Sequence, residues 1–125
     1  MIDLDFDAVT KLNKLLNLPY EDDMQDWDIE LANSHRVPEF CDVYEREDLD
    51  ASEKQALMAL IIASYDDYLE ERNNDLFLWN KIATLLRKDF DLHKSTLLYW
   101  LDEEEEQEEM IGEHAIAPLL RSLLS

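Results

Sequence analysis

The side chains that could carry out chemistry in this chain are one cysteine, three histidines and 31 acids. Cys41 and His35 could in principle combine a nucleophile with a base. Both lie in an acid-rich stretch, and nearby negative charge raises the pKa of a thiol and so lowers its reactivity. His93 stands beside Lys94 near an expected helix start, and we interpret it as a partly exposed surface or packing residue. We therefore predict no catalytic pair.

Metal ligands need a defined spacing, which these residues lack. A di-iron bundle requires glutamate three residues before an inward-facing histidine, and those positions hold Ala32, Phe90 and Ile111. Cys41 and the scattered histidines do not match zinc-ligand spacing, and the acids lack the loop spacing and glycine of an EF-hand. The single glycine, Gly112, cannot form a phosphate-binding loop. We predict no metal site and no cofactor, and we expect a protein that is not an enzyme.

Net charge is the most unusual property of the chain. It has 31 acidic against 11 basic residues, a formal charge of −20. Such a surface disfavours direct contact with nucleic acid or an anionic membrane and favours a basic protein partner. The charge is segregated, because residues 1–71 carry −15, residues 72–98 carry +2 and residues 99–125 carry −7.

Two acidic stretches stand out as candidate contact surfaces. Residues 20–30 join six acids to aromatic side chains, and seven of the eight residues in 102–109 are acids. Carboxylates can stand in for phosphates, while aromatic rings can anchor a partner. The competing interpretation is that both acidic stretches only face solvent and that the tryptophan is a core residue. The candidate partner-binding residues are Asp22, Asp23, Asp26, Trp27, Asp66, Asp67, Glu103, Glu104 and Glu106.

The elements that position these residues are expected to be helices. With one glycine and three prolines there is little material for hairpin turns, and apolar residues recur every three or four positions. We predict one all-α domain over residues 1–125, a bundle of about six or seven helices around a central apolar helix at about residues 51–71. Asp50 or Ser52 caps that helix, and Glu53 or Gln55 completes a capping box.

The surrounding helices follow from caps and apolar spacing. A first helix, capped by Asp5 or Asp7, is predicted to end near Asn17. The other predictions are a helix at about residues 23–33, a short one after Pro38, one over residues 75–90 that packs on the central helix, one capped by Asp91 and a last one opened by Pro118.

The acid run at residues 102–109 could either continue the preceding helix or interrupt it. A continuous helix over residues 92–111 would place seven like-charge pairs three or four residues apart, at roughly 1.4–3.5 kcal/mol of repulsion in total. A break near Asp102 avoids this cost, because Asp102 and Glu105 then form a capping box and Gly112 supplies a left-handed stop. We favour the break over the continuous helix.

The expected compartment is the cytoplasm. The longest apolar run is far shorter than the roughly 20 residues that cross a bilayer. The first residues, MIDLDFDAVTK, are acidic, whereas a signal peptide begins with a basic stretch. A lone cysteine cannot form an internal disulfide, which agrees with a reducing compartment.

The chain also resembles a known group of proteins. LPYEDDMQDWDIELANSHRVPEF, EKQALMALIIASYDDYLEE and WNKIATLLRKDFDLHKSTLLYW occur in the order seen in small, acidic, all-helical bacterial immunity proteins of contact-dependent or polymorphic toxin systems. The resemblance implies that the protein binds one cognate toxin domain, often a nuclease, and neutralises it by occlusion. It assigns no contact residue. An acidic regulatory or adaptor protein, or a nucleic-acid mimic acting on another basic protein, is the alternative.

Overall fold

The computed structural model describes residues 5–20, 27–71, 76–106 and 115–124. Within these ranges all regular structure is helical, which confirms the predicted all-α class. The elements in chain order are α1 (Phe6–Leu15), α2 (Trp27–Glu30), the 3₁₀ turn η1 (Ser34–Arg36), α3 (Val37–Arg46), α4 (Ala51–Glu70), α5 (Leu76–Lys88), α6 (Phe90–Glu106) and α7 (Ala117–Leu124).

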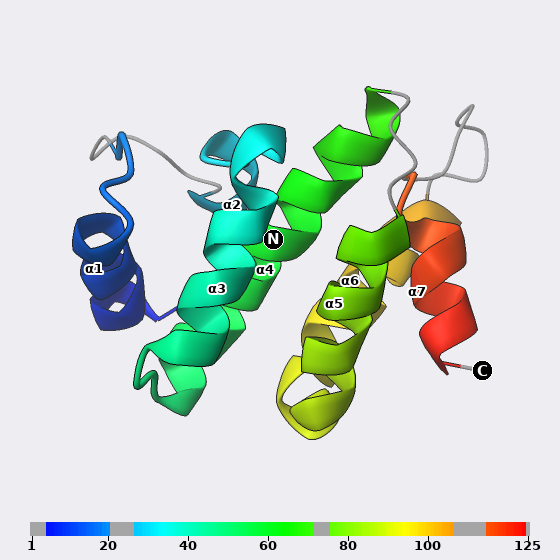
Figure 1. Ribbon diagram of the computed structural model, residues 1–125. Helices are drawn as coiled ribbons and strands as arrows, with labels where there is room; N and C mark the ends of the chain where they lie inside the picture. The colour runs from blue at the N-terminus through cyan, green and yellow to red at the C-terminus, as the bar shows by residue number, and fades with distance from the viewer. Residues whose placement is uncertain (1–4, 21–26, 72–75, 107–114, 125) are drawn as a thin grey trace.

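Helix α4 is the centre of the fold, as its sequence predicts. The Asp50 side chain accepts from the Glu53 amide at 2.8 Å, and the Glu53 side chain accepts from the Asp50 amide at 3.0 Å. This capping box fixes where the helix begins. Residues 56–63 are buried on every side, and α4 crosses the molecule diagonally between α1–α3 and α5–α7 (Figure 1).

No helix in the described part has both the length and the apolarity to cross a bilayer.

The first helix matches its prediction at both ends. The Asp5 side chain accepts from the Ala8 amide at 3.0 Å and caps α1. At the other end Asn17 has a φ of 52°, in the left-handed region that asparagine tolerates, and the Leu18 amide bonds back to the Asn13 carbonyl at 3.0 Å. This left-handed turn at Asn17 provides a donor for the last carbonyls of the helix and directs the polypeptide away from the helix axis.

The second helix is shorter than predicted. Its described part ends at Glu30, not Asn33, while residues 23–26 of the prediction lie outside the described residues. Asn33 explains this end, because its side chain accepts from the His35 amide at 2.9 Å and caps η1 instead of continuing α2. Its own amide donates to Ser64 Oγ of α4 at 2.9 Å, which attaches this turn to the central helix.

Helices α5 and α6 form an antiparallel pair that turns at Asp89 (Figure 1). The prediction that Asp91 caps α6 is wrong by two residues. The Asp89 carbonyl accepts from the amides of Leu92 and His93, so Asp91 lies inside the first turn. The Trp79 ring of α5 stacks on Tyr65 of α4 at 6.1 Å between centroids, which confirms the predicted contact with the central helix.

Helix α6 continues through the start of the acid run, so the predicted break near Asp102 is wrong. Only three like-charge pairs fall within residues 102–106, a cost of about 0.6–1.5 kcal/mol at low salt. Extending an existing helix is easier than nucleating a new one, and Leu97 and Trp100 already bury this helix against the core. The predicted stop at Gly112 lies outside the described residues. Pro118 is the second residue of α7, as expected for a helix opened by proline.

Candidate functional site

Six of the nine predicted contact residues lie outside the part of the chain whose side chains the structure describes. Asp22, Asp23 and Asp26 belong to residues 21–26. Glu103, Glu104 and Glu106 lie on the last turns of α6, where only the backbone is described. Their role in partner binding stays a prediction.

Trp27 is a core residue in this structure. Its side chain is 6% exposed, and its indole N–H donates to Asn13 Oδ1 of α1 at 2.7 Å. A buried tryptophan usually finds such a partner for its single donor. The ring therefore attaches α2 to α1 and does not lie on an exposed contact surface, so Trp27 is left out of the surface proposed below.

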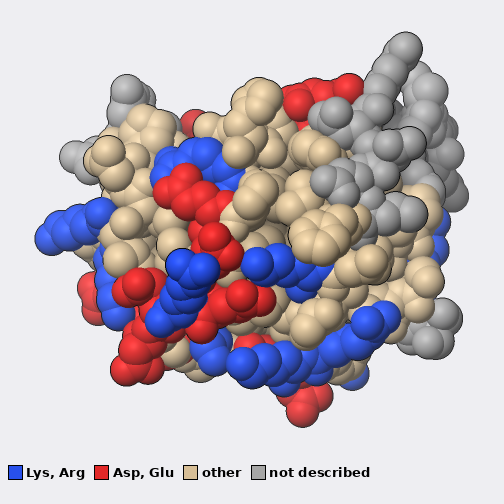
Figure 2. Space-filling model, in the orientation of Figure 1, with Lys and Arg blue, Asp and Glu red and all other residues tan. Residues whose placement is uncertain are grey.

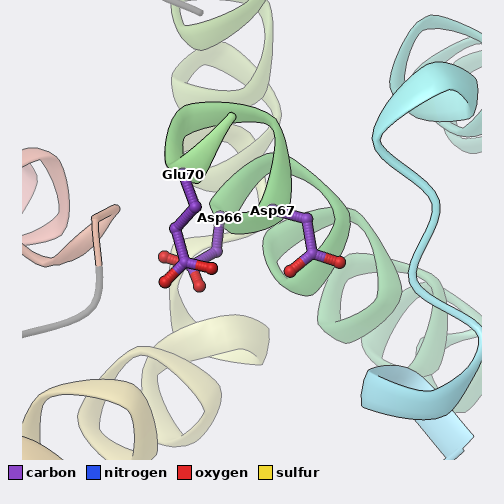
Figure 3. Close-up of side chains that lie close together, drawn as sticks. All are labelled: Asp66, Asp67 and Glu70. Atoms are coloured by element: carbon purple, nitrogen blue, oxygen red, sulfur yellow. The ribbon is translucent and has the colours of Figure 1, made fainter. Parts of the chain in front are cut away.

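Asp66 and Asp67 form a cluster with Glu70 on the last turns of α4 (Figure 3). One side-chain oxygen from each lies within 4.8 Å of the others. Carboxylate oxygens are ligands that Ca²⁺ and Mg²⁺ prefer, but Ca²⁺ takes six to eight of them. One Asp66 oxygen is moreover engaged elsewhere, because Oδ1 accepts from the Ile116 amide at 3.0 Å. The arrangement is better explained by a structural role.

That structural role belongs to Asp66 alone. It is 5% exposed, and its bond to Ile116 spans 50 residues of sequence, joining the end of α4 to the residue before α7. Asp67 is only half-buried, and partial burial together with Glu70 and Glu71 raises the pKa of its carboxyl. The Asp66 carboxyl thus has a defined backbone donor in Ile116, whereas the charged form of the Asp67 carboxyl is opposed by its surroundings.

Alanine substitution should separate the two neighbours. Asp66→Ala leaves the buried Ile116 amide without its hydrogen-bond acceptor, so we expect it to lower the free energy of unfolding by about 2 kcal/mol. Asp67→Ala is the matched control, and it should be neutral or slightly stabilising because it removes like-charge repulsion. Urea denaturation of both variants measures the difference. Equal losses would show that Asp66 does not act as the acceptor for α7.

The acidity of the chain is concentrated outside the described side chains. Seventeen acids and ten bases have described side chains, a net charge of −7, so −13 of the total of −20 lies elsewhere. Residues 21–26 hold four of those acids and residues 102–113 hold eight. Figure 2 shows that basic and acidic groups alternate over the face of α3 and α5. On that face Lys81 lies 3.1 Å from Asp42 and 3.6 Å from Glu45, so it is not a surface of one sign.

One acidic corner of the described body was missed by the sequence interpretation. Lys11 of α1 bonds Glu53 of α4 at 3.0 Å, and this hydrogen bond is the main cause that raises the pKa of the Lys11 ammonium, to which Asp50 and Asp48 add. Asp5, at the start of α1, acts on Glu53 in turn. Asp48, Asp50 and Glu53 are close in the sequence, but Lys11 and Asp5 are more than 40 residues away from Glu53, so the sequence does not show that these groups meet. Packing of α1 on α4 brings them together.

A buried polar cluster was missed for the same reason. His93 was expected to be partly exposed, but it is 0% exposed, so that part of the interpretation is wrong and the packing role is right. Its ring lies against Tyr44 of α3, whose hydroxyl also reaches Asp89 in the α5–α6 turn. Lys54 of α4 lies 3.8 Å from Asp89. The Tyr44 hydroxyl oxygen thus lies where α3, α4 and α6 meet.

The Cys41 thiol has the raised pKa that the sequence predicts, but the main reason differs. Burial is the largest cause and raises it to about 12; Glu45 and Asp42 add to it, while Lys81 opposes it. Cys41 is 0% exposed, so the thiol stays protonated at neutral pH and lies inside the core.

Comparison with family models, curated proteins and solved structures finds no match. The resemblance to immunity proteins therefore stays an expectation from the sequence. Any function has to be inferred from the chain's own charge and packing.

Proposed function

We propose that this protein is a non-catalytic immunity protein that binds a basic toxin domain and neutralises it by covering its working surface. The observation that supports the proposal is the acid surplus of −20 on an all-helical body. Among the described side chains seventeen acids outnumber ten bases, and four of those bases, Lys11, Arg36, Lys54 and Lys81, are paired with carboxylates.

The physical basis is electrostatic complementarity. A nuclease holds the phosphates of its substrate with basic side chains, and those side chains would equally attract an array of carboxylates. Long-range attraction between opposite charges speeds association most at low ionic strength, because salt screens exposed charges beyond about 10 Å at 0.1 M. An inhibitor of this kind needs a rigid body that presents acids, and it needs no chemistry of its own.

The proposed contact surface is the acidic stretch of residues 21–26, with the acids of 103–106 as a second part. Residues 21–26 directly precede Trp27, which is fixed in the core through Asn13. The stretch is therefore attached to the body at a defined point. The corner around Lys11 is a further acidic region of the described body, and the α3–α5 face with its alternating charges is the least suited to a basic partner.

Capture of the partner from the source cell tests the proposal. The tagged protein should retain a basic toxin domain that elutes as salt is raised, and adding the protein to that domain should abolish its toxic activity. Capture of a basic regulatory factor instead would favour the alternative of an adaptor or nucleic-acid mimic. Retention of an acidic partner, or continued toxicity of the saturated complex, would contradict occlusion of a basic toxin.

The acids of residues 21–26 should set the rate of association with that partner. The triple variant Asp22→Asn, Asp23→Asn, Asp26→Asn should slow association by about 10-fold at low salt and reduce its salt dependence, because local charge steers encounter. Stopped-flow mixing at several salt concentrations measures both effects.

A control variant of equal charge separates local from total charge. Asp7→Asn, Glu47→Gln and Asp91→Asn change the net charge by the same amount at exposed positions in α1, directly after α3 and in α6. This control should slow association much less than the triple variant. Equal slowing in both would mean that only net charge matters, and an unchanged rate in the triple variant would remove residues 21–26 from the contact surface.

A further inference from the structure

The buried cluster around Tyr44 has one arrangement of hydrogens that fits its geometry. The Tyr44 oxygen lies 2.8 Å from Asp89 Oδ2 and 2.6 Å from His93 Nε2. A carboxylate only accepts hydrogen bonds, so the single phenol hydrogen is donated to Asp89. His93 Nε2 must then carry a hydrogen and donate it to the Tyr44 oxygen. The two hydrogen bonds thus form a chain in which His93 donates to Tyr44 and Tyr44 donates to Asp89.

Protonation of His93 conflicts with this arrangement. Because Nε2 already carries a hydrogen, an added proton has to go to Nδ1, which has no hydrogen-bond partner among the described residues and is fully buried. A buried cation with an unsatisfied donor is costly. Burial is the largest cause that lowers the pKa of His93, to about 4, and Lys54 lowers it further while Asp89 raises it.

The charged groups on the other elements that contact α6 do not remove that cost. The α3 element presents the Tyr44 phenol, whose pKa is raised by burial and by Asp89, so it stays neutral. Lys81 of α5 lies against Asp42 and Glu45. The remaining basic side chains on α5 and α7 are Arg87, Lys88 and Arg121, all of them exposed.

We propose that the His93–Tyr44–Asp89 chain is an acid-sensitive joint, which holds α6 against α3 while His93 is neutral and opens when His93 is protonated. This inference is independent of the proposed partner. It assigns a regulatory property to the body of the protein, because a mildly acidic environment would loosen the packing that positions α6 and the acids at its end.

The sign of the effect follows from the two protonation states. In the unfolded or opened chain His93 has an ordinary pKa near 6.5, while in the closed structure it is about 4. The stability that neutral His93 supports is complete above pH 6.5 and is lost as the pH falls from 6.5 to 4. At pH 5 the opening equilibrium constant should be about 30-fold higher than at pH 7.5.

Urea denaturation at pH 7.5 and pH 5 is the first test. His93→Gln keeps an N–H donor for Tyr44 and cannot be protonated, so it should lack the 30-fold rise, whereas His35→Gln, at an exposed position, should keep it. Comparing each variant with itself at the two pH values cancels any fixed loss of stability. An equal pH dependence in the wild type and His93→Gln would overturn the proposal.

Cys41 reports opening at the joint itself, because it is buried on α3 three residues before Tyr44. The rate at which it reacts with 4,4′-dithiodipyridine should rise in the wild type relative to His93→Gln as the pH falls from 7.5 to 5. If His93→Gln does not fold, nuclear magnetic resonance titration of the wild type decides instead. Protonation of His93 only below about pH 5, accompanied by changes in Tyr44, supports the joint, and protonation near 6.5 without such changes overturns it.

Discussion

Alanine substitution at three consecutive positions of α4, Leu60, Ile61 and Ile62, is expected to lower the free energy of unfolding by about 2–5 kcal/mol each. All three side chains are 0% exposed. Consecutive residues on a helix point about 100° apart, so three costly neighbours are possible only where the helix is surrounded. Each truncation removes buried methyl groups and leaves a cavity that neighbouring helices cannot fill completely. Chemical denaturation of the three single variants measures the losses.

The matching control comes from a helix that is buried on one side only. In α1, Leu12 is 0% exposed while Leu15 is 39% exposed. Leu12→Ala should therefore be costly, and Leu15→Ala should stay within about 1 kcal/mol of the wild type. A neutral result at any of the three α4 positions would contradict the central placement of that helix.

Tyr44→Phe is expected to lower the free energy of unfolding by about 2–3 kcal/mol, although it removes a single oxygen atom. The loss leaves His93 Nε2 buried without its acceptor and takes a donor from Asp89. Removing one partner from a buried network costs more than an average hydrogen bond contributes, because the remaining group has already lost its water. Thermal or urea unfolding at pH 7.5 measures the change.

Tyr20→Phe is the control for Tyr44→Phe. Tyr20 is half-buried and also belongs to the edge of the core, but its hydroxyl has no hydrogen bond within the described ranges. The same chemical change there should stay within about 0.5 kcal/mol of the wild type. A loss of similar size in both variants would show that the ring environment, and not the hydroxyl network, sets the cost.

The parts of the fold that were predicted correctly depend on interactions between residues that are close in the sequence. Asp5 and Asp50 cap the helices that follow them, and each cap bonds an amide three residues along the chain. The uninterrupted apolar stretch around Leu60 indicated a helix surrounded by others. These features can be read from the sequence because their causes lie within one helical turn.

The wrong predictions share a different cause. The sequence predicted Asp91 as the cap of α6, but the turn between α5 and α6 starts the helix two residues earlier, with the Asp89 carbonyl accepting from the Leu92 and His93 amides. Repulsion along the acid run favoured a break at Asp102, but packing of Trp100 and its neighbours on the core carries α6 onward. In both cases a local preference of about 1 kcal/mol was overridden by tertiary contacts.

The sequence by itself determined the helical class, the central helix, the main caps and the acid surplus, because each follows from composition or from residues a few positions apart. Only the tertiary structure decided which polar groups have partners. Asp66 reaches Ile116 across 50 residues, and Tyr44 reaches His93 across 49. Burial changes the energetics of a charge or a hydrogen bond far more than sequence neighbours do. The acid-sensitive joint proposed at His93 therefore exists only once α3 and α6 have packed together.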